Sequence, residues 1–201
     1  MSFSLVPEHE TLAWKAVGQQ GMLANSAART TLLVVGGALF VALTAQIRIP
    51  LPFTPVPITG QTLGVLLVGG LLGTRSGAAS LLLYLLMGFV GLPFFTGGAS
   101  GIEQLFGATG GYLVAFPIAA ALVGWLAERG WDRRFRTTVA AMLLGNLVIY
   151  VLGAGWLAFG VGLGLDKALT LGVLPFLIGD AIKMALAGVA LPGGWKLIGK
   201  E

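Results

Sequence analysis

The chain has 201 residues, of which 56% are hydrophobic and only 10% are charged. Because an average soluble domain carries about 25% charged residues, this composition is typical of a membrane protein. The formal net charge is +4, but the basic residues lie between apolar stretches, so we interpret them as topology signals and not as a nucleic-acid-binding face. The absence of cysteine excludes disulfides and thiolate metal sites.

Residues 1–30 are mixed and polar, and they lack the short apolar core followed by small residues that a cleaved signal peptide needs. We expect this segment to stay, in the cytoplasm or at the membrane surface. Apolar residues between Leu12 and Leu23 fit a weak amphipathic helix lying on the membrane, and a disordered tail is the alternative.

Residues 31–195 contain six apolar segments, and a short cytoplasmic tail, residues 196–201, follows them. A bilayer core about 30 Å thick needs about 20 mostly apolar residues for each helical span. The six predicted spans are 31–49, 59–73, 77–95, 110–128, 137–164 and 168–191. The sequence therefore predicts an all-α membrane protein with six transmembrane helices.

The distribution of Lys and Arg predicts the orientation of these spans, because cytoplasmic connections hold more of these residues. Arg48 and Lys167 fall on one side of the membrane, and Lys183 lies inside the last span. The other nine of the twelve basic residues fall on the opposite side: Lys15, Arg29, Arg75, Arg129, Arg133, Arg134, Arg136, Lys196 and Lys200. Six spans with both termini in the cytoplasm satisfy this pattern.

Two long connections on the outer side have unusual compositions. The first, residues 49–59, reads IPLPFTPVPIT, and its four prolines predict an extended, semi-rigid strap. The second, residues 95–111, reads FTGGASGIEQLFGATGG, and its glycines permit tight turns and leave backbone amides open to a ligand. Two such loops on the same side of a bundle with intramembrane charge suggest that they form a lid that covers a binding site. The alternative is that both are ordinary loops.

The strongest single signal is GDAIK at 179–183 in the last span, because a carboxylate and an ammonium at hydrocarbon depth are costly unless they are paired or serve a site. Asp180 and Lys183 lie on one helix face, so they can simply neutralise one another. Alternatively, the carboxylate accepts and the ammonium donates hydrogen bonds to a neutral ligand that offers N–H and C=O side by side.

Other polar residues in the spans are weaker signals. Gln61, Asn146 and Tyr150 can hydrogen-bond between helices as structural links, and we favour this role for Gln61. Asn146 is kept as a candidate substrate contact. Tyr112 follows the glycine-rich connection and is expected to face the mouth of a cavity.

The sequence offers no machinery for catalysis, so we expect that the protein is not an enzyme and needs no metal or cofactor. It has no zinc-protease helix, nucleophile elbow or plausible triad, and its only histidine, His9, lies outside the bundle. A pump without a nucleotide site of its own must use an ion gradient or borrow an ATPase.

Four motifs carry a family resemblance: PVPITGQTLGVLL at 55–67, GLPFFTGG at 91–98, GATGGYL at 107–113 and GDAIK at 179–183. Together they closely resemble BioY, the biotin-specific substrate-binding (S) component of energy-coupling factor (ECF) transporters. The resemblance implies the six-helix S-component fold and high-affinity biotin uptake across a prokaryotic plasma membrane. It also implies partners, namely a transmembrane coupling protein and two cytosolic ATPases.

The resemblance further assigns roles to individual residues. Asp180 and Lys183 would hold the ureido ring of biotin, and the segment from Gly97 and Gly98 to Tyr112 would supply further walls and backbone donors. Arg48 is a candidate partner for the valerate carboxylate, with loop amides as its rival. An Ala-x-x-x-Ala pattern, Ala38 and Ala42, occupies the place that the family uses to dock onto the coupling protein.

Three alternatives stay open at this point. In a gradient-driven secondary transporter of another small molecule, Asp180 would take up the coupling proton, but the inverted repeats that would support it are not visible. An intramembrane enzyme would need a nucleophile or a metal site. In a purely structural bundle, Asp180 and Lys183 would form an inert pair.

Overall fold

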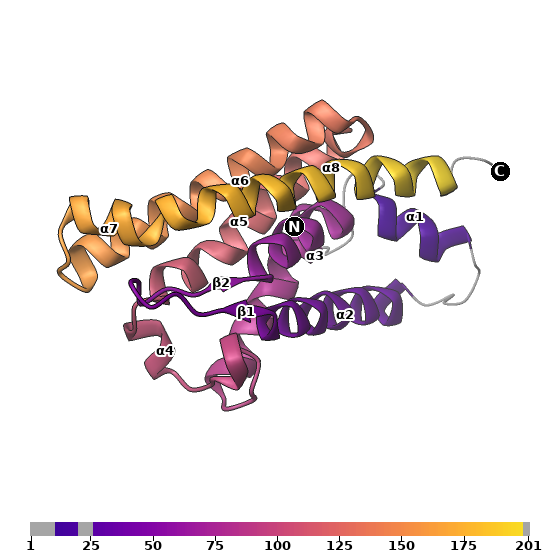
Figure 1. Cartoon of the computed structure of the whole chain (residues 1–201). Helices are drawn as coiled ribbons and strands as arrows, with labels where there is room; N and C mark the ends of the chain where they lie inside the picture. Colours follow the sequence, from indigo (N-terminus) through magenta and orange to yellow (C-terminus); the bar gives the residue numbers. More distant parts are fainter. Residues whose placement is uncertain (1–10, 20–25, 199–201) are drawn as a thin grey trace.

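The computed structural model describes residues 11–19 and 26–198, and the regular secondary structure in this part of the chain is helical apart from one short ribbon of two strands. The elements in chain order are α1 (Leu12–Gln19), α2 (Ser26–Gln46), β1 (Arg48–Ile49), β2 (Ile58–Thr59), α3 (Gln61–Phe89), the 3-10 turn η1 (Thr96–Gly98), α4 (Glu103–Phe106), α5 (Gly110–Glu128), the 3-10 turn η2 (Trp131–Arg133), α6 (Phe135–Gly155), the π-helical turn η3 (Trp156–Gly160), α7 (Leu165–Gly172), the 3-10 turn η4 (Leu174–Phe176) and α8 (Leu177–Ile198). The long helices form a bundle, with α4, α7 and the strands at one end and α1 and the carboxyl terminus at the other (Figure 1).

Helix α3 is folded back on itself at Gly73, whose φ of 83° and ψ of −177° are not helical. The side-chain amide of Gln61 donates to the hydroxyl of Tyr84 at 2.6 Å, although a straight helix would separate residues 23 positions apart by about 35 Å. The two arms of α3 are therefore antiparallel neighbours. Among the described residues, five helical segments are long and apolar enough to cross a membrane, and the doubled α3 makes six helices. The predicted all-α, six-helix membrane bundle is confirmed.

The reversal at Gly73 is held by α5. The backbone N–H and the hydroxyl of Thr74 both donate to the carboxylate of Glu128, each at 2.8 Å. The carboxylate therefore caps the backbone amide at the start of the second arm of α3. A Cβ on Gly124 would lie 2.4 Å from the carbonyl carbon of Gly73, so only glycine lets α5 approach this closely.

Helix α1 packs under the same reversal. The hydroxyl of Thr11 donates to the carbonyl of Leu71, and the indole of Trp14 donates to the carbonyl of Leu72, at 2.9 and 3.2 Å. These donors satisfy carbonyls that the break at Gly73 leaves without helical partners. The predicted amphipathic segment is thus helical over Leu12–Gln19, and its remainder lies outside the described residues.

The outer surface of the bundle is apolar. Leu43 and Ile178, for example, are 69% and 79% exposed, whereas Gln61, Asn146 and Asp180 are buried between helices. This distribution, with hydrophobic side chains outside and polar side chains inside, suits a protein surrounded by lipid.

Two spans are less regular than the sequence predicts. Helix α6 passes into the π-helical turn η3 and then into a connection where Gly162 and Gly164 have positive φ angles. The last span, predicted at 168–191, is divided at η4, where Pro175 cannot donate a backbone hydrogen bond, and its long part is α8. The strap also differs, because its ends pair as the antiparallel strands β1 and β2.

Candidate substrate-binding site

A cavity of about 280 Å³ lies between the strap, the glycine-rich connection and the helices α3, α5, α6 and α8. Its volume is near the lower end of the range typical of small-molecule sites, about 300–1,000 Å³. Pro55, Val56 and Pro57 of the strap line one side, and residues 107–109 of the glycine-rich connection line another. Both connections therefore contribute to one cavity.

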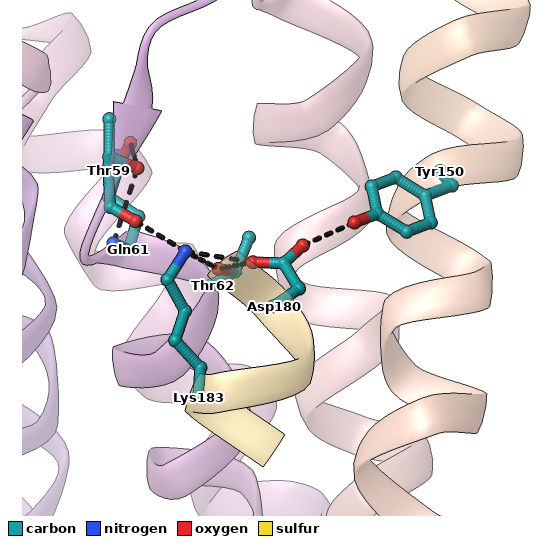
Figure 2. A network of polar contacts seen from close by, with 6 residues as sticks. All are labelled: Thr59, Gln61, Thr62, Tyr150, Asp180 and Lys183. Atoms are coloured by element: carbon teal, nitrogen blue, oxygen red, sulfur yellow. Dashed lines mark hydrogen bonds and ion pairs between the residues drawn. The ribbon is translucent and has the colours of Figure 1, made fainter. Parts of the chain in front are cut away.

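A network of polar side chains borders the cavity (Figure 2). The ammonium of Lys183 donates to the carbonyl of Thr59, the hydroxyl of Thr62 and Oδ1 of Asp180, at 2.7, 2.8 and 2.8 Å. The hydroxyl of Thr62 also donates to Oδ1 of Asp180 at 3.0 Å, and the hydroxyl of Tyr150 donates to Oδ2. The ion pair is thus one part of a network that joins α3, α6 and α8.

The network leaves Asp180 with spare capacity. An ionised carboxylate offers about four lone-pair sites, and the three bonds above occupy three of them. All three N–H donors of Lys183, in contrast, already have an acceptor. A ligand can therefore add an N–H to Asp180 directly, whereas a ligand carbonyl must share or replace one acceptor of Lys183.

A second group of polar side chains continues the network toward the glycine-rich connection. The side-chain oxygen of Gln61 accepts from the hydroxyls of Thr59 and Thr96, at 3.1 and 2.8 Å. Its amide nitrogen donates to Tyr84, as described above. Gln61 therefore fixes the end of the strap to the loop at Thr96, on the border of the cavity.

The remaining walls are mainly apolar and aromatic. Phe95, Phe116, Ile149 and Phe176 line them, together with the ring of Tyr112. The hydroxyl of Tyr112 donates to the carbonyl of Gly172 at 2.7 Å, so its polar end is satisfied outside the cavity. Such walls suit a ligand with a polar head and an apolar body.

Arg48 places a positive charge at the border of the cavity. It lies in β1 opposite Thr59, it is exposed, and it lines the cavity. Its guanidinium passes close over Gly97, where an added Cβ would lie 2.4 Å from Nη1, and the φ of +70° there also favours glycine.

Comparisons with known proteins identify the family. The sequence profile of the BioY family matches residues 17–200. The chain belongs to the BioY family. It is 45% identical over 151 residues to a probable biotin transporter BioY of Pyrococcus horikoshii, covering 75% of this chain and 88% of that protein. It is 39% identical over 171 residues to a biotin transporter BioY of Rhizobium etli, covering 80% and 91%.

A solved structure agrees with this assignment. The crystal structure at 2.1 Å of the S-component for biotin from an ECF-type ABC transporter matches with a TM-score of 0.79 and 30% sequence identity, covering 88% of this chain and 95% of that one. The predicted S-component fold is therefore confirmed. The chain is a multi-pass membrane protein of a transporter family, which is not an enzyme class.

The structure of this BioY chain brings four of the predicted substrate contacts to the cavity, namely Asp180, Lys183, Tyr112 and Arg48. Gly97 and Gly98 do not line it, although their neighbour Thr96 does.

Asn146 does not line the cavity either. It is 2% exposed, one helical turn before Tyr150, and its Oδ1 has no hydrogen-bond partner within the described residues. These observations place Asn146 behind the wall of the cavity.

Three residues that the sequence analysis left without a ligand role also border the cavity: Thr59, Thr62 and Tyr150. Thr59 and Thr62 follow the prolines of the strap directly, so their position at the start of α3 was a usable signal. Tyr150 was interpreted as a structural link, and only the packing of α6 against α8 shows that it meets Asp180.

The docking role of Ala38 and Ala42 stays a prediction. These side chains are only 2% and 7% exposed, because α2 turns this face toward α3 and the core. The small-residue spacing here lets α2 pack closely inside the chain.

Proposed function

We propose that the chain binds biotin in this cavity and takes part in high-affinity biotin uptake as the membrane-embedded S-component of an ECF-type ABC transporter. The observation that carries the proposal is the pair Asp180 and Lys183, which borders a cavity inside a bundle of the S-component fold. The names of the relatives support biotin as the ligand.

The ureido ring of biotin suits the polar end of the cavity. It offers two N–H groups beside one carbonyl, and the free lone-pair site of Asp180 accepts one of these N–H groups. The carbonyl takes a hydrogen bond from Lys183 in place of the contact with Thr59 or Thr62. Charge-assisted hydrogen bonds of this kind are about twice as strong as neutral ones, which favours tight binding.

The residues that line the cavity suggest positions for the other two parts of biotin. The sulfur-containing ring packs against Phe116, Ile149 and Phe176, which remove its apolar surface from water. The valerate chain then runs toward the strap, where Arg48 meets its carboxylate. Backbone amides of the glycine-rich connection, including those of Gly97 and Gly98, are the rival partners for this group.

The energy for uptake would come from the partners of an S-component. An S-component works with a coupling protein in the membrane and with two cytosolic ATPases, so this chain needs no cofactor of its own and biotin is its only small-molecule ligand. The excess of Lys and Arg at the end that holds α1 and the last turns of α8 supports an orientation with both termini in the cytoplasm of a prokaryotic cell. The cavity then opens toward the outside.

The proposal is tested by calorimetry with biotin and the purified chain in detergent. We expect Asp180→Asn and Lys183→Met each to weaken binding by at least about 30-fold, because each removes a charged ligand contact and leaves the other charge without its counter-ion. Asp166→Asn and Lys167→Met are matched controls, since these neighbours on α7 are exposed and lie outside the cavity. They should bind biotin like the parent.

One result would overturn the ligand assignment, and another would overturn the role of the ion pair. A folded parent that binds no biotin would leave the ligand of the cavity unidentified. Unchanged binding in both cavity variants would keep biotin as the ligand but make the ion pair structural.

A further inference from the structure

A second hollow lies far from the substrate cavity, at the end of the bundle that holds the carboxyl terminus of α8 (Figure 1). It runs between the start of α6 and the last turns of α8. Its lining combines three cations with apolar surface: Arg133, Arg134, Lys196, Phe135, Val189 and Gly193. We call it the basic groove.

Arg134 and Lys196 of the basic groove form no ion pair with the acidic residues that the structure describes at this end. The carboxylate of Glu128 is taken up by Thr74 at the reversal of α3. The carboxylate of Asp132 is buried and accepts a hydrogen bond from the indole of Trp195. Arg134 and Lys196 are exposed, while the guanidinium of Arg133 stacks over the ring of Trp195 at 4.6 Å.

The floor of the basic groove is open and apolar. A Cβ added to Gly193 would meet no atom within 4 Å, so this glycine borders free space. One turn away, Gly188 allows α8 to approach Phe135 and Val139 closely, since an added Cβ would lie 3.0 and 2.8 Å from their side chains. The helices therefore touch at Gly188, while Gly193 and the exposed side chain of Val189 border the open space of the groove.

We propose that the basic groove binds one anionic phospholipid, with the phosphate between Arg134 and Lys196 and the start of an acyl chain along Phe135, Val189 and Gly193. The location supports a lipid, because the groove joins the charged end of a bundle to its lipid-facing apolar surface. Basic pockets between membrane helices favour anionic head groups by charge complementarity. The proposal concerns neither the substrate cavity nor biotin, so it stands or falls independently of the proposed function.

The test measures retained lipid by native mass spectrometry, after the delipidated chain is mixed with phosphatidylglycerol or phosphatidylcholine. The parent should retain phosphatidylglycerol preferentially, as a single bound lipid. The double variant Arg134→Gln/Lys196→Gln should lose affinity by about fivefold for each cation removed. Gly193→Leu keeps every charge but fills the floor, and it should lose the bound lipid as well.

The control removes the same amount of charge outside the groove. Arg129→Gln/Arg136→Gln deletes two cations at the same end of the bundle that do not line it, so the preference should persist. Thermal unfolding followed by tryptophan fluorescence confirms that each variant is folded, and single substitutions of the exposed Arg134 or Lys196 replace any that is not.

Three outcomes would overturn the proposal. The parent shows no preference between the two lipids; the control pair loses as much lipid as the groove pair, which indicates a diffuse basic surface; or Gly193→Leu retains the lipid in full. Binding of glycerol phosphate as tightly as of the lipid would also count against an acyl-chain contact.

Discussion

Asp180 is held by three donors on three different helices, and this arrangement favours the proposed binding role over an inert ion pair. An i, i+3 pair alone needs only Lys183, yet Thr62 and Tyr150 also donate to the carboxylate. Their combined effect is to hold the carboxylate in one orientation at the border of the cavity. The acceptor is thus preorganised, so little free energy is lost in orienting it when a ligand binds.

The contribution of Tyr150 is open to direct measurement. Tyr150→Phe removes the hydroxyl that orients Oδ2 of Asp180, and a hydrogen bond to a charged group contributes about 1.5–3 kcal/mol. We expect biotin affinity to fall at least about tenfold in calorimetry. Tyr112→Phe is the comparison, because its hydroxyl bonds a neutral carbonyl outside the cavity. A larger loss for Tyr112→Phe than for Tyr150→Phe would contradict this account.

Arg48 can be tested with a change in the ligand. If its guanidinium meets the valerate carboxylate, Arg48→Gln should weaken biotin by about fivefold or more but leave the affinity for the neutral biotin amide almost unchanged. Lys167→Gln, which removes the other cation on this side, is the control. Equal losses for biotin and its amide would show that Arg48 acts on the strap and not on the carboxylate.

At the scale of single residues, the sequence singled out the charged members of the network but not the neutral ones. Asp180 and Lys183 stand out because charge is rare in an apolar span. Thr62 and Tyr150 do not, since hydroxyls occur commonly in membrane helices and their role depends on which faces α3 and α6 turn toward α8. Gly97 and Gly98 were predicted from the openness of their amides, but the guanidinium of Arg48 packs over Gly97.

Among the elements, the folded-back α3 and its contact with α5 place Gln61 and Thr62 at the cavity. Gly124→Ala should loosen this contact, because the new methyl group would meet the backbone of Gly73 and Thr74 at 2.4 and 2.5 Å. Overpacking of this kind costs about 1–3 kcal/mol, and each kcal/mol lowers the Tm of a chain this size by about 2–4 °C.

The control for this prediction is Gly193→Ala, a helical glycine with open space around its Cβ position. It should leave the Tm unchanged or raise it slightly, because alanine favours the helix. Both are read by tryptophan fluorescence in the same detergent. A Tm for Gly124→Ala equal to that of the control would mean that α5 can move away without cost.

The connection between α5 and α6 contains a carboxylate whose protonation should affect stability. Burial raises the pKa of the Asp132 carboxyl above its ordinary value of 3.8, although the hydrogen bond from Trp195 and the charge of Arg133 oppose this. The folded chain therefore binds this proton more tightly than the unfolded chain, so the proton stabilises the fold at low pH. That stabilisation is lost as the pH rises from 3.8 through the raised pKa.

Asp132→Asn should remove this dependence. We expect the Tm difference between variant and parent to grow in favour of the variant as the pH rises across that window, and to stay constant at higher pH. Asp166→Asn, an exposed carboxylate, should leave the pH profile of the parent unchanged. A profile for Asp132→Asn that is parallel to the parent's would show that Asp132 titrates normally.

For the whole molecule, the sequence predicted the six-helix bundle because the hydrophobic spacing and the alternation of charge both depend on the bilayer. It did not predict the pairing of β1 with β2, or the burial of Ala38 and Ala42, because both depend on how neighbouring helices rotate about their axes. The break at Gly73 was placed correctly between two spans, since a glycine next to Thr74 and Arg75 interrupts the apolar run.

The charge pattern predicts the orientation in the membrane, and this prediction can be measured cleanly because the chain contains no cysteine. Single reporters at Leu197→Cys, beside Lys196, and at Asp166→Cys, at the start of α7, lie at opposite ends of the bundle (Figure 1). A maleimide that cannot cross membranes should label Asp166→Cys in intact cells and Leu197→Cys only after permeabilisation. The reverse pattern would contradict the orientation that places the cavity toward the outside, and with it the direction of biotin uptake.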